Sequence, residues 1–326
     1  MEYQEPAVIF EEMNRLGSRG EPFLFAVDFE LQQGFLVPDP QEQREVFYEF
    51  LGEGNKDRSA VPAASEVTLR SSPMSLKEYA GMFEVVRRGL ARGDSYLVNL
   101  TAATEICCSL PLAEIFRRST APWQLYVPGR FVCFSPERFV RIKDGQISTC
   151  PMKGTIKAEI PNAAEIILND PKETAEHATI VDLLRNDLSL SARKVHVSRY
   201  RYIDRIRTRQ REILQVSSEI AGTLPGDWRS RLGGIIGRML PAGSCSGAPK
   251  ESTVDIIRRA ELGPRGFYTG VSGLFDGQNF DSAVLIRFIE EKDGQMFFRS
   301  GGGITAQSSL ESEYLELLDK IYLPFA

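Results

Sequence analysis

Residues 130–149, RFVCFSPERFVRIKDGQIST, carry the pattern that decides the fold class. Two extended segments rich in apolar residues flank the pair Asp144-Gly145, which is a strong short-range signal for a β-hairpin turn. The stretch therefore predicts two antiparallel strands joined through residues 143–146.

The same pattern returns nearer the C-terminus, where residues 266–305 are typical of an antiparallel meander of three or four strands that ends at residues 301–303, Gly-Gly-Gly. Longer helical segments separate the hairpins: a capped helix is expected over 75–93, another over 170–190 and a last one over 309–321. Hairpins that alternate with helices, without a regular βαβ rhythm, favour an α+β fold. We expect large antiparallel β-sheets packed as a sandwich, with helices on the outside.

Composition narrows the class of protein. The chain has 326 residues, of which 42% are hydrophobic and 25% charged, as is usual for a globular protein. Its 39 Lys and Arg against 44 Asp and Glu leave a net charge of −5, and an acidic chain is a poor candidate for binding nucleic acid. No apolar run approaches the ~20 residues of a membrane helix, and the N-terminus lacks a signal-peptide pattern. We expect a cytoplasmic protein with no membrane or nucleic-acid partner.

Two acidic residues of the last predicted helix are candidate metal ligands. Glu313 and Glu316 are one turn apart on one flank, and two carboxylates so placed can supply oxygens to a hard ion such as Mg²⁺. A solvated acidic face has the same spacing. The glycines at 301–303 precede this helix, and the backbone amides of such a turn can bind an anion, although a plain flexible turn has the same sequence pattern.

A lysine and two glutamates form a second group of candidates. Glu137 precedes the predicted hairpin turn and Lys153 follows it, so a simple hairpin would bring both towards the same end of the paired strands. A lysine beside a carboxylate is usually a surface ion pair, and it is a nucleophile when partly desolvated. Glu176 lies on the 170–190 helix, upstream of Asp182 and Arg185, which we interpret as a structural ion pair.

These motifs occur together in the order found in one enzyme family. The sequence resembles the chorismate-utilising enzymes, which include component I of anthranilate synthase, component I of aminodeoxychorismate synthase, and the isochorismate and salicylate synthases. The resemblance extends from about Gly93 to the C-terminus and rests on SPE at 135–137, PMKGT at 151–155, EH at 176–177, VDLLRNDL at 181–188, SGAPK at 246–250, RGFYTG at 265–270 and the stretch 301–316. It implies a catalytic, chorismate-binding domain over residues 71–326, with a short N-terminal region, residues 1–70, that contributes strands to the sheet.

Lys153 narrows the choice within the family. In the Pro-x-Lys-Gly-Thr form of its motif, the aminodeoxychorismate synthases place a nucleophilic lysine where anthranilate synthases carry alanine. The resemblance therefore implies that chorismate and ammonia are converted to 4-amino-4-deoxychorismate, for p-aminobenzoate and folate synthesis, with ammonia from a glutamine amidotransferase partner. Anthranilate synthase component I and a non-catalytic chorismate-binding paralogue are the alternatives. Gln215, where several relatives have histidine, and the missing arginine after Thr155 depart from the family pattern.

The resemblance also implies roles for single residues. Lys153 would attack C2 of chorismate while Glu137, as general acid, protonates the departing C4 hydroxyl. Mg²⁺ would be held by Glu176 and Glu316, with Glu313 close by or bound through water, and would neutralise the ring carboxylate. The implied substrate contacts are Arg287, Tyr268, the amides of Gly301, Gly302 and Gly303, Thr155 and Ser246.

Overall fold

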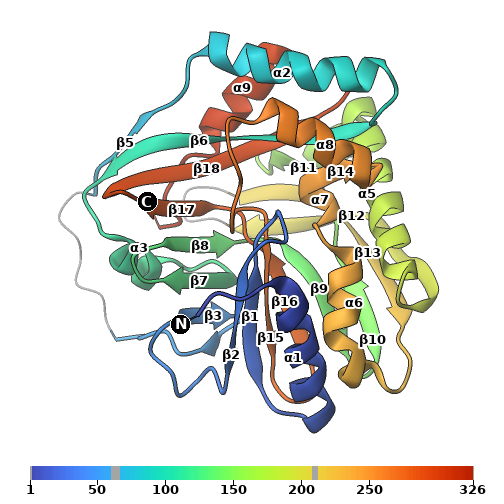
Figure 1. Cartoon of the computed structure of the whole chain (residues 1–326). Helices are drawn as coiled ribbons and strands as arrows, with labels where there is room; N and C mark the ends of the chain where they lie inside the picture. The colour runs from blue at the N-terminus through green and yellow to red at the C-terminus, as the bar shows by residue number, and fades with distance from the viewer. Residues whose placement is uncertain (1, 60–66, 208–211, 326) are drawn as a thin grey trace.

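Two nine-stranded antiparallel β-sheets form the body of the protein (Figure 1). The computed structural model describes residues 2–59, 67–207 and 212–325. One apolar cluster combines residues of both sheets, such as Leu24 and Phe35 of one sheet with Tyr48 and Leu125 of the other, so the sheets pack face to face. The predicted α+β architecture of large antiparallel sheets is confirmed.

The first sheet, sheet A, contains the predicted hairpin. Gln146 pairs with Lys143 across the Asp144-Gly145 turn. The strand order is β11 (Met152–Lys157), β13 (Glu212–Thr223), β10 (Gln146–Thr149), β9 (Arg138–Lys143), β16 (Phe280–Val284), β15 (Val271–Phe275), β1 (Phe23–Val27) and β2 (Gly34–Pro38), with β12 (Arg193–Arg207) also paired to β13. Strand β1 of the N-terminal region thus lies inside this sheet, and the division of the chain at residue 70 stays a prediction.

The second sheet, sheet B, is built on the long strands β6 and β18, which pair from Val98 with Ile304 to Ile106 with Met296. The strand order is β14 (Gly247–Ala248), β6 (Leu97–Cys108), β18 (Gln295–Ile304), β17 (Phe288–Lys292), β8 (Phe131–Ser135), β7 (Trp123–Val127), β3 (Phe47–Phe50) and β4 (Glu53–Gly54), with β5 (Leu69–Ser72) also paired to β6.

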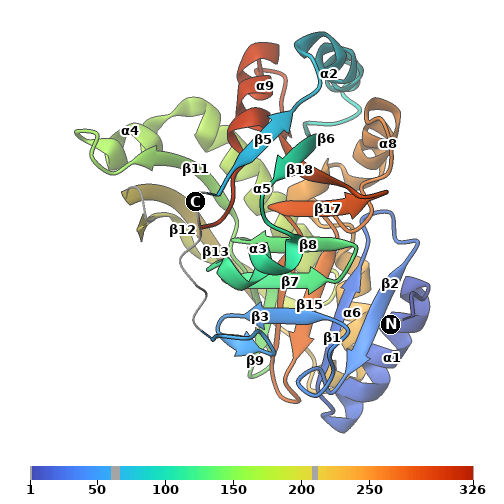
Figure 2. The same cartoon turned by 90° about the vertical axis from the view of Figure 1, so that its left-hand side faces the viewer.

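Helices cover the sheets from outside (Figure 2). α1 (Pro6–Arg19), α5 (Pro171–Ser189) and α6 (Leu232–Met239) bury apolar residues in a cluster with strands of sheet A. α2 (Leu76–Ala91), α8 (Lys250–Ala260) and α9 (Leu310–Asp319) do the same on β6 of sheet B. The shorter helices are α3 (Leu112–Arg118), α4 (Ala163–Asn169), α7 (Gly243–Ser246) and a 3₁₀ turn at Trp228–Arg231. Of the helices in the described ranges, none is long and apolar enough to cross a membrane.

The predicted number of strands in residues 130–149 is wrong, because this stretch forms three strands instead of two. β8 ends at Ser135 in sheet B, and β9 begins at Arg138 in sheet A. Pro136 lies at the break, where a residue without a backbone N–H ends the ladder of hydrogen bonds. The C-terminal meander divides in the same way, since β15 and β16 belong to sheet A whereas β17 and β18 belong to sheet B.

Candidate active site

The chain passes from one sheet to the other at two places that lie side by side and are joined by backbone hydrogen bonds. The β8–β9 crossing carries Glu137, and the β16–β17 crossing carries Arg287 in a left-handed turn conformation, with φ of 55°. The Val284 amide donates to the Glu137 carbonyl oxygen at 3.2 Å, and the Phe134 amide donates to the Arg287 carbonyl oxygen at 3.0 Å. The sequence-distant residues Glu137 and Arg287 are thereby held in one region between the sheets.

Glu137 has the environment of a general acid. Its side chain is partly buried, and the Ser244 hydroxyl on α7 donates to its Oε1 at 2.6 Å. Burial raises the pKa of the Glu137 carboxyl, and the Ser244 hydrogen bond and the charges of Lys153, Arg287 and Lys320 offset part of that rise. A raised pKa keeps the proton on the carboxyl at higher pH, as proton donation to a leaving group requires.

Lys153 reaches the same region from β11. Its Nζ lies 3.4 Å from Glu176 Oε2 on α5, and 26% of the lysine side chain is exposed. Gly154, with φ of 76°, forms a bulge against β13. Because Lys153 and Thr155 pair with consecutive residues of β13, the bulge sets their side chains on opposite faces. Thr155 is exposed there, so the structure does not bring it together with Lys153.

The three predicted metal ligands come from two helices. Glu176 on α5 and Glu313 on α9 are buried, and Glu316 is more exposed. A Cβ built on Gly302 would lie 3.3 Å from Glu316 Oε1 and 3.4 Å from Glu313 Oε2, so these carboxylates converge over the glycine. Glu176 Oε1 is buried, and no group of the described chain makes a hydrogen bond to it. A buried carboxylate oxygen without a partner destabilises the fold unless a cation or a hydrogen-bond donor contacts it.

Two lysines neutralise this carboxylate group. Lys172 Nζ lies 3.9 Å from Glu176 Oε1 and 3.4 Å from Glu313 Oε1, so it links α5 with α9. Lys320 Nζ lies 2.7 Å from Glu316 Oε1, and although burial alone would raise the pKa of Glu316, the charge and hydrogen bond of Lys320 lower it. Within residues 2–59, 67–207 and 212–325, no three His, Cys, Asp or Glu side chains already stand close enough to hold a metal, and Lys172 lies between two of the candidate ligands.

The glycines at 301–303 lie within β18, so the turn predicted for them is wrong. They pair with residues 99–101 of β6, whereas β17 pairs only as far as Arg299 on the other side. Lys320 donates to the Gly301 carbonyl oxygen at 2.6 Å from that unpaired edge. In a strand, the amide and the carbonyl of one residue point to the same edge, and so do those of the residue two positions on. The amides of Gly301 and Gly303 therefore also point to the unpaired edge of β18. They remain candidates for binding an anion.

The other predicted substrate contacts differ in their surroundings. Tyr268 is buried against Phe288, with ring centroids 5.9 Å apart, and burial raises the pKa of its phenol, which stays a hydrogen-bond donor. Arg287 donates from Nε to the Tyr322 hydroxyl at 3.0 Å. Ser246 is buried, and its hydroxyl donates to the carbonyl oxygen of Ala242, the residue before α7, at 3.0 Å, so this hydroxyl already has a partner.

Three residues of this region were not predicted from the sequence: Lys172, Ser244 and Lys320. Lys172–Glu176 and Glu316–Lys320 are i,i+4 pairs on or next to a helix, a spacing that is visible in the sequence. Ser244 and Glu137 are 107 residues apart, and no sequence pattern connects them.

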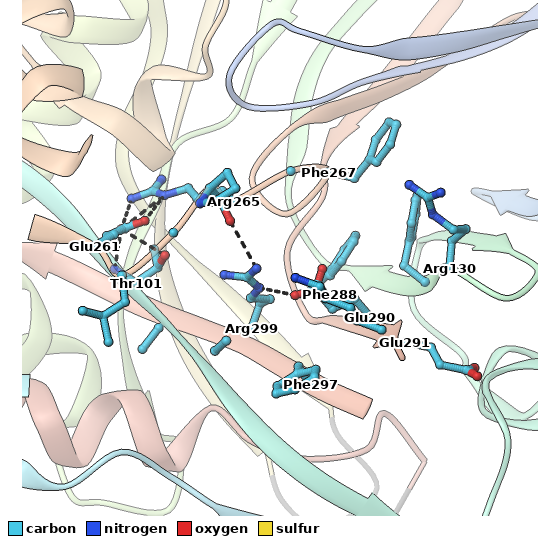
Figure 3. Close-up of a pocket in the computed structure, with 18 of the residues that line it drawn as sticks. Thr101, Arg130, Glu261, Arg265, Phe267, Phe288, Glu290, Glu291, Phe297 and Arg299 are labelled. Atoms are coloured by element: carbon cyan, nitrogen blue, oxygen red, sulfur yellow. Dashed lines mark hydrogen bonds and ion pairs between the residues drawn. The ribbon is translucent and has the colours of Figure 1, made fainter. Parts of the chain in front are cut away.

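A cavity of about 650 Å³ opens beside β6, β18 and the segment 261–267 (Figure 3). The stacked rings of Phe131, Phe267 and Phe288 form part of its wall, together with Arg130 and Arg299. None of the predicted catalytic, substrate-binding or metal-binding residues lines it.

Comparison with known proteins identifies the family. Residues 22–325 match the sequence profile of the chorismate binding enzymes. The chain belongs to this family. The resemblance inferred from the motifs at 135–137, 151–155 and 301–316 is therefore confirmed.

Relatives within the chorismate binding enzymes carry more than one name. An uncharacterized PabA-like protein of Pasteurella multocida is 49% identical over 315 residues, which cover 96% of this chain and 97% of the relative. Aminodeoxychorismate synthase component 1 of Klebsiella aerogenes is 30% identical over 81% of this chain and 61% of the relative. Anthranilate synthase component 1 of Haloarcula marismortui is 31% identical over 86% of this chain and 62% of the relative. The chain thus spans about three fifths of the two named enzymes.

Solved structures of chorismate binding enzymes share the fold. Anthranilate synthase component I from Streptococcus pneumoniae superposes with a TM-score of 0.65 at 26% identity, over 87% of this chain and 61% of the other. The menaquinone-specific isochorismate synthase from Escherichia coli superposes with a TM-score of 0.72 at 17% identity, over 96% of this chain and 80% of the other. The second likeness concerns the fold alone.

Proposed function

We propose that this chorismate binding enzyme is an aminodeoxychorismate synthase component I, which converts chorismate and ammonia to 4-amino-4-deoxychorismate, with ammonia supplied by a glutamine amidotransferase partner. The observation that carries the proposal is the position of Lys153. Its Nζ lies 3.4 Å from Glu176 Oε2 and would lie 3.2 Å from a Cβ on Gly303, so the lysine lies between a proposed metal ligand and the glycine segment of β18. Relatives named aminodeoxychorismate synthase component 1 support the assignment.

The proposed reaction then consists of two nucleophilic displacements on chorismate. The neutral amine of Lys153 forms a bond to C2, while the Glu137 carboxyl gives its proton to the C4 hydroxyl, which leaves as water. Ammonia forms a bond to C4 in the second displacement, and the bond between C2 and Lys153 Nζ breaks. The enolpyruvyl group stays attached, since no step acts on it.

We also propose that Glu176, Glu313 and Glu316 hold Mg²⁺. Carboxylate oxygens are the ligands that this ion prefers, two of the carboxylates converge over Gly302, and the third has a buried oxygen without a hydrogen-bond partner in the described chain. When bound, the ion neutralises the ring carboxylate of chorismate. When the ion is not bound, the nearby Lys172 supplies positive charge between Glu176 and Glu313.

Product analysis tests the reaction. Purified protein with chorismate, ammonium and Mg²⁺ should yield 4-amino-4-deoxychorismate by mass spectrometry, and a coupled assay should detect no matching release of pyruvate. Anthranilate synthase is the second candidate, because relatives with that name have similar identity to the chain. Fluorescent anthranilate and an equal amount of pyruvate in the same assay would establish that activity instead.

Glu316→Gln tests the metal site. The change keeps the side-chain volume and removes one charge, so Mg²⁺ affinity should fall on the order of tenfold or more. Calorimetric titration with Mg²⁺ measures this without turnover, and the thermal midpoint should stay close to that of the native protein because about half of the Glu316 side chain, 48%, is exposed. Glu311→Gln, on the exposed first turn of the same helix, is the matched control. Equal Mg²⁺ affinity for the two variants would contradict the assignment.

A further inference from the structure

Asn99 lies on β6 directly opposite Gly303 of β18. Directly opposite residues of antiparallel strands project from the same face of a sheet. Lys153 Nζ approaches that face, since a Cβ on Gly303 would lie 3.2 Å from Nζ and 3.0 Å from Leu97 Cδ1. Leu97 is two residues before Asn99 and shares its face. The Asn99 side chain therefore projects from the sheet face that the Lys153 amine approaches, where Leu97 is an apolar neighbour.

The side-chain oxygen of Asn99 is a buried acceptor with no hydrogen-bond donor in the part of the chain that the structure describes. Such an oxygen is costly unless a further group satisfies it. The backbone of Asn99, by contrast, is anchored: its carbonyl oxygen accepts from Arg265 Nη2 at 2.7 Å. Arg265 is itself buried and paired with Glu261 at 2.6 Å, as Figure 3 shows beside Thr101. The strand position is thus held firmly while Oδ1 is left for another donor.

A nucleophilic lysine is a suitable donor. A neutral amine has two N–H bonds and one lone pair, and only the lone pair can attack carbon. Glu176 Oε2, 3.4 Å from Nζ, is placed to accept one N–H. A second acceptor on the other N–H would leave the lone pair with one direction, and the apolar side chain of Leu97 offers no competing contact.

We propose that Asn99 is a positioning residue for Lys153: its Oδ1 accepts an N–H of the lysine amine and, together with Glu176, directs the lone pair at C2 of chorismate. This inference rests on the proposed role of Lys153 as nucleophile. The bond changes are those of the first displacement: Nζ–C2 forms, C4–O breaks, and the proton comes from Glu137.

The test measures covalent attachment of chorismate to Lys153 in a single turnover without ammonium, by rapid quench and mass spectrometry of the Lys153 peptide. Asn99→Leu keeps a similar volume and removes the acceptor, and it should slow attachment on the order of 10²-fold, as expected when a reacting group loses its alignment. Chorismate affinity should stay within about twofold, because Asn99 acts through the lysine.

The thermal midpoint of Asn99→Leu should not fall, since the variant no longer buries an unsatisfied oxygen. Asn99→Gln keeps an amide oxygen as acceptor, adds no charge, and should recover part of the rate.

Each contrary result has a specific interpretation for the role of Asn99. Native attachment rates in Asn99→Leu would overturn the inference, and so would attachment in Asn99→Gln as slow as in Asn99→Leu. A raised KM for ammonium with normal attachment would assign Asn99 to ammonia and also overturn it. If the native protein formed neither adduct nor 4-amino-4-deoxychorismate, the proposed function itself would fall, and this outcome is recognised without any variant.

Discussion

Lys153→Ala should lower the rate of chorismate amination on the order of 10³-fold or more, and the covalent adduct should disappear. Alanine cannot form the bond to C2 on which both displacements depend. Folding should survive at a cost on the order of a few kcal/mol, because Glu176 is buried but keeps Lys172 at 3.9 Å when Lys153 is removed. Mass spectrometry of product and of the Lys153 peptide measures both effects.

Lys157→Ala is the matched control for this variant. Lys157 ends the same strand, β11, and is exposed to solvent. It should retain native turnover, which separates the loss of one amine from disturbance of the strand. Turnover of Lys153→Ala close to that of Lys157→Ala would mean that Lys153 is only an ion-pair partner.

Glu137→Gln should lower turnover on the order of 10²- to 10⁴-fold, because the amide has the shape of the carboxyl and cannot give a proton to the C4 hydroxyl. Burial raises the pKa of Glu137, so the folded state binds this proton more tightly than the unfolded chain. The contribution of Glu137 to stability is therefore greatest below the ordinary glutamate pKa and falls as pH rises through the raised value. Glutamine has no charge to bury, and the thermal midpoint of the variant at neutral pH should not be lower than that of the native protein.

The pH profile of kcat/KM adds a second check on Glu137. Native turnover should decline as pH rises through the pKa of this carboxyl, since only the protonated form acts. Ser244 donates to the carboxylate and so holds that pKa down. Ser244→Ala should move the declining limb to higher pH, and Ser244→Thr, which keeps a hydroxyl, should move it less. An unmoved limb in Ser244→Ala would exclude Glu137 as the group that titrates.

The predictions from sequence succeeded where the signal is local. The Asp144-Gly145 hairpin is present, and so is the cap of the helix expected over 75–93, which is a capping box between Ser75 and Glu78. Both geometries depend on a few neighbouring residues. The predictions failed where one sequence pattern is compatible with two different structures. An extended run cannot show that β8 and β9 belong to different sheets, and a glycine run is compatible with a turn as well as with β18.

The sequence by itself determined the family and the α+β class of this protein, since an ordered set of motifs is specific even when each motif alone is weak. It also named Glu137, Lys153 and Glu176 as candidates. Only the tertiary structure decided which neighbours surround them: the Ser244 hydroxyl lies on Glu137, and Lys172 lies between Glu176 and Glu313. It also placed Asn99, whose side-chain oxygen has no donor among the described residues, opposite Gly303. The physical reason is that pKa values and nucleophile alignment depend on burial and on contacts a few ångströms long, and sheet pairing and crossings between sheets create these contacts among residues far apart in the chain.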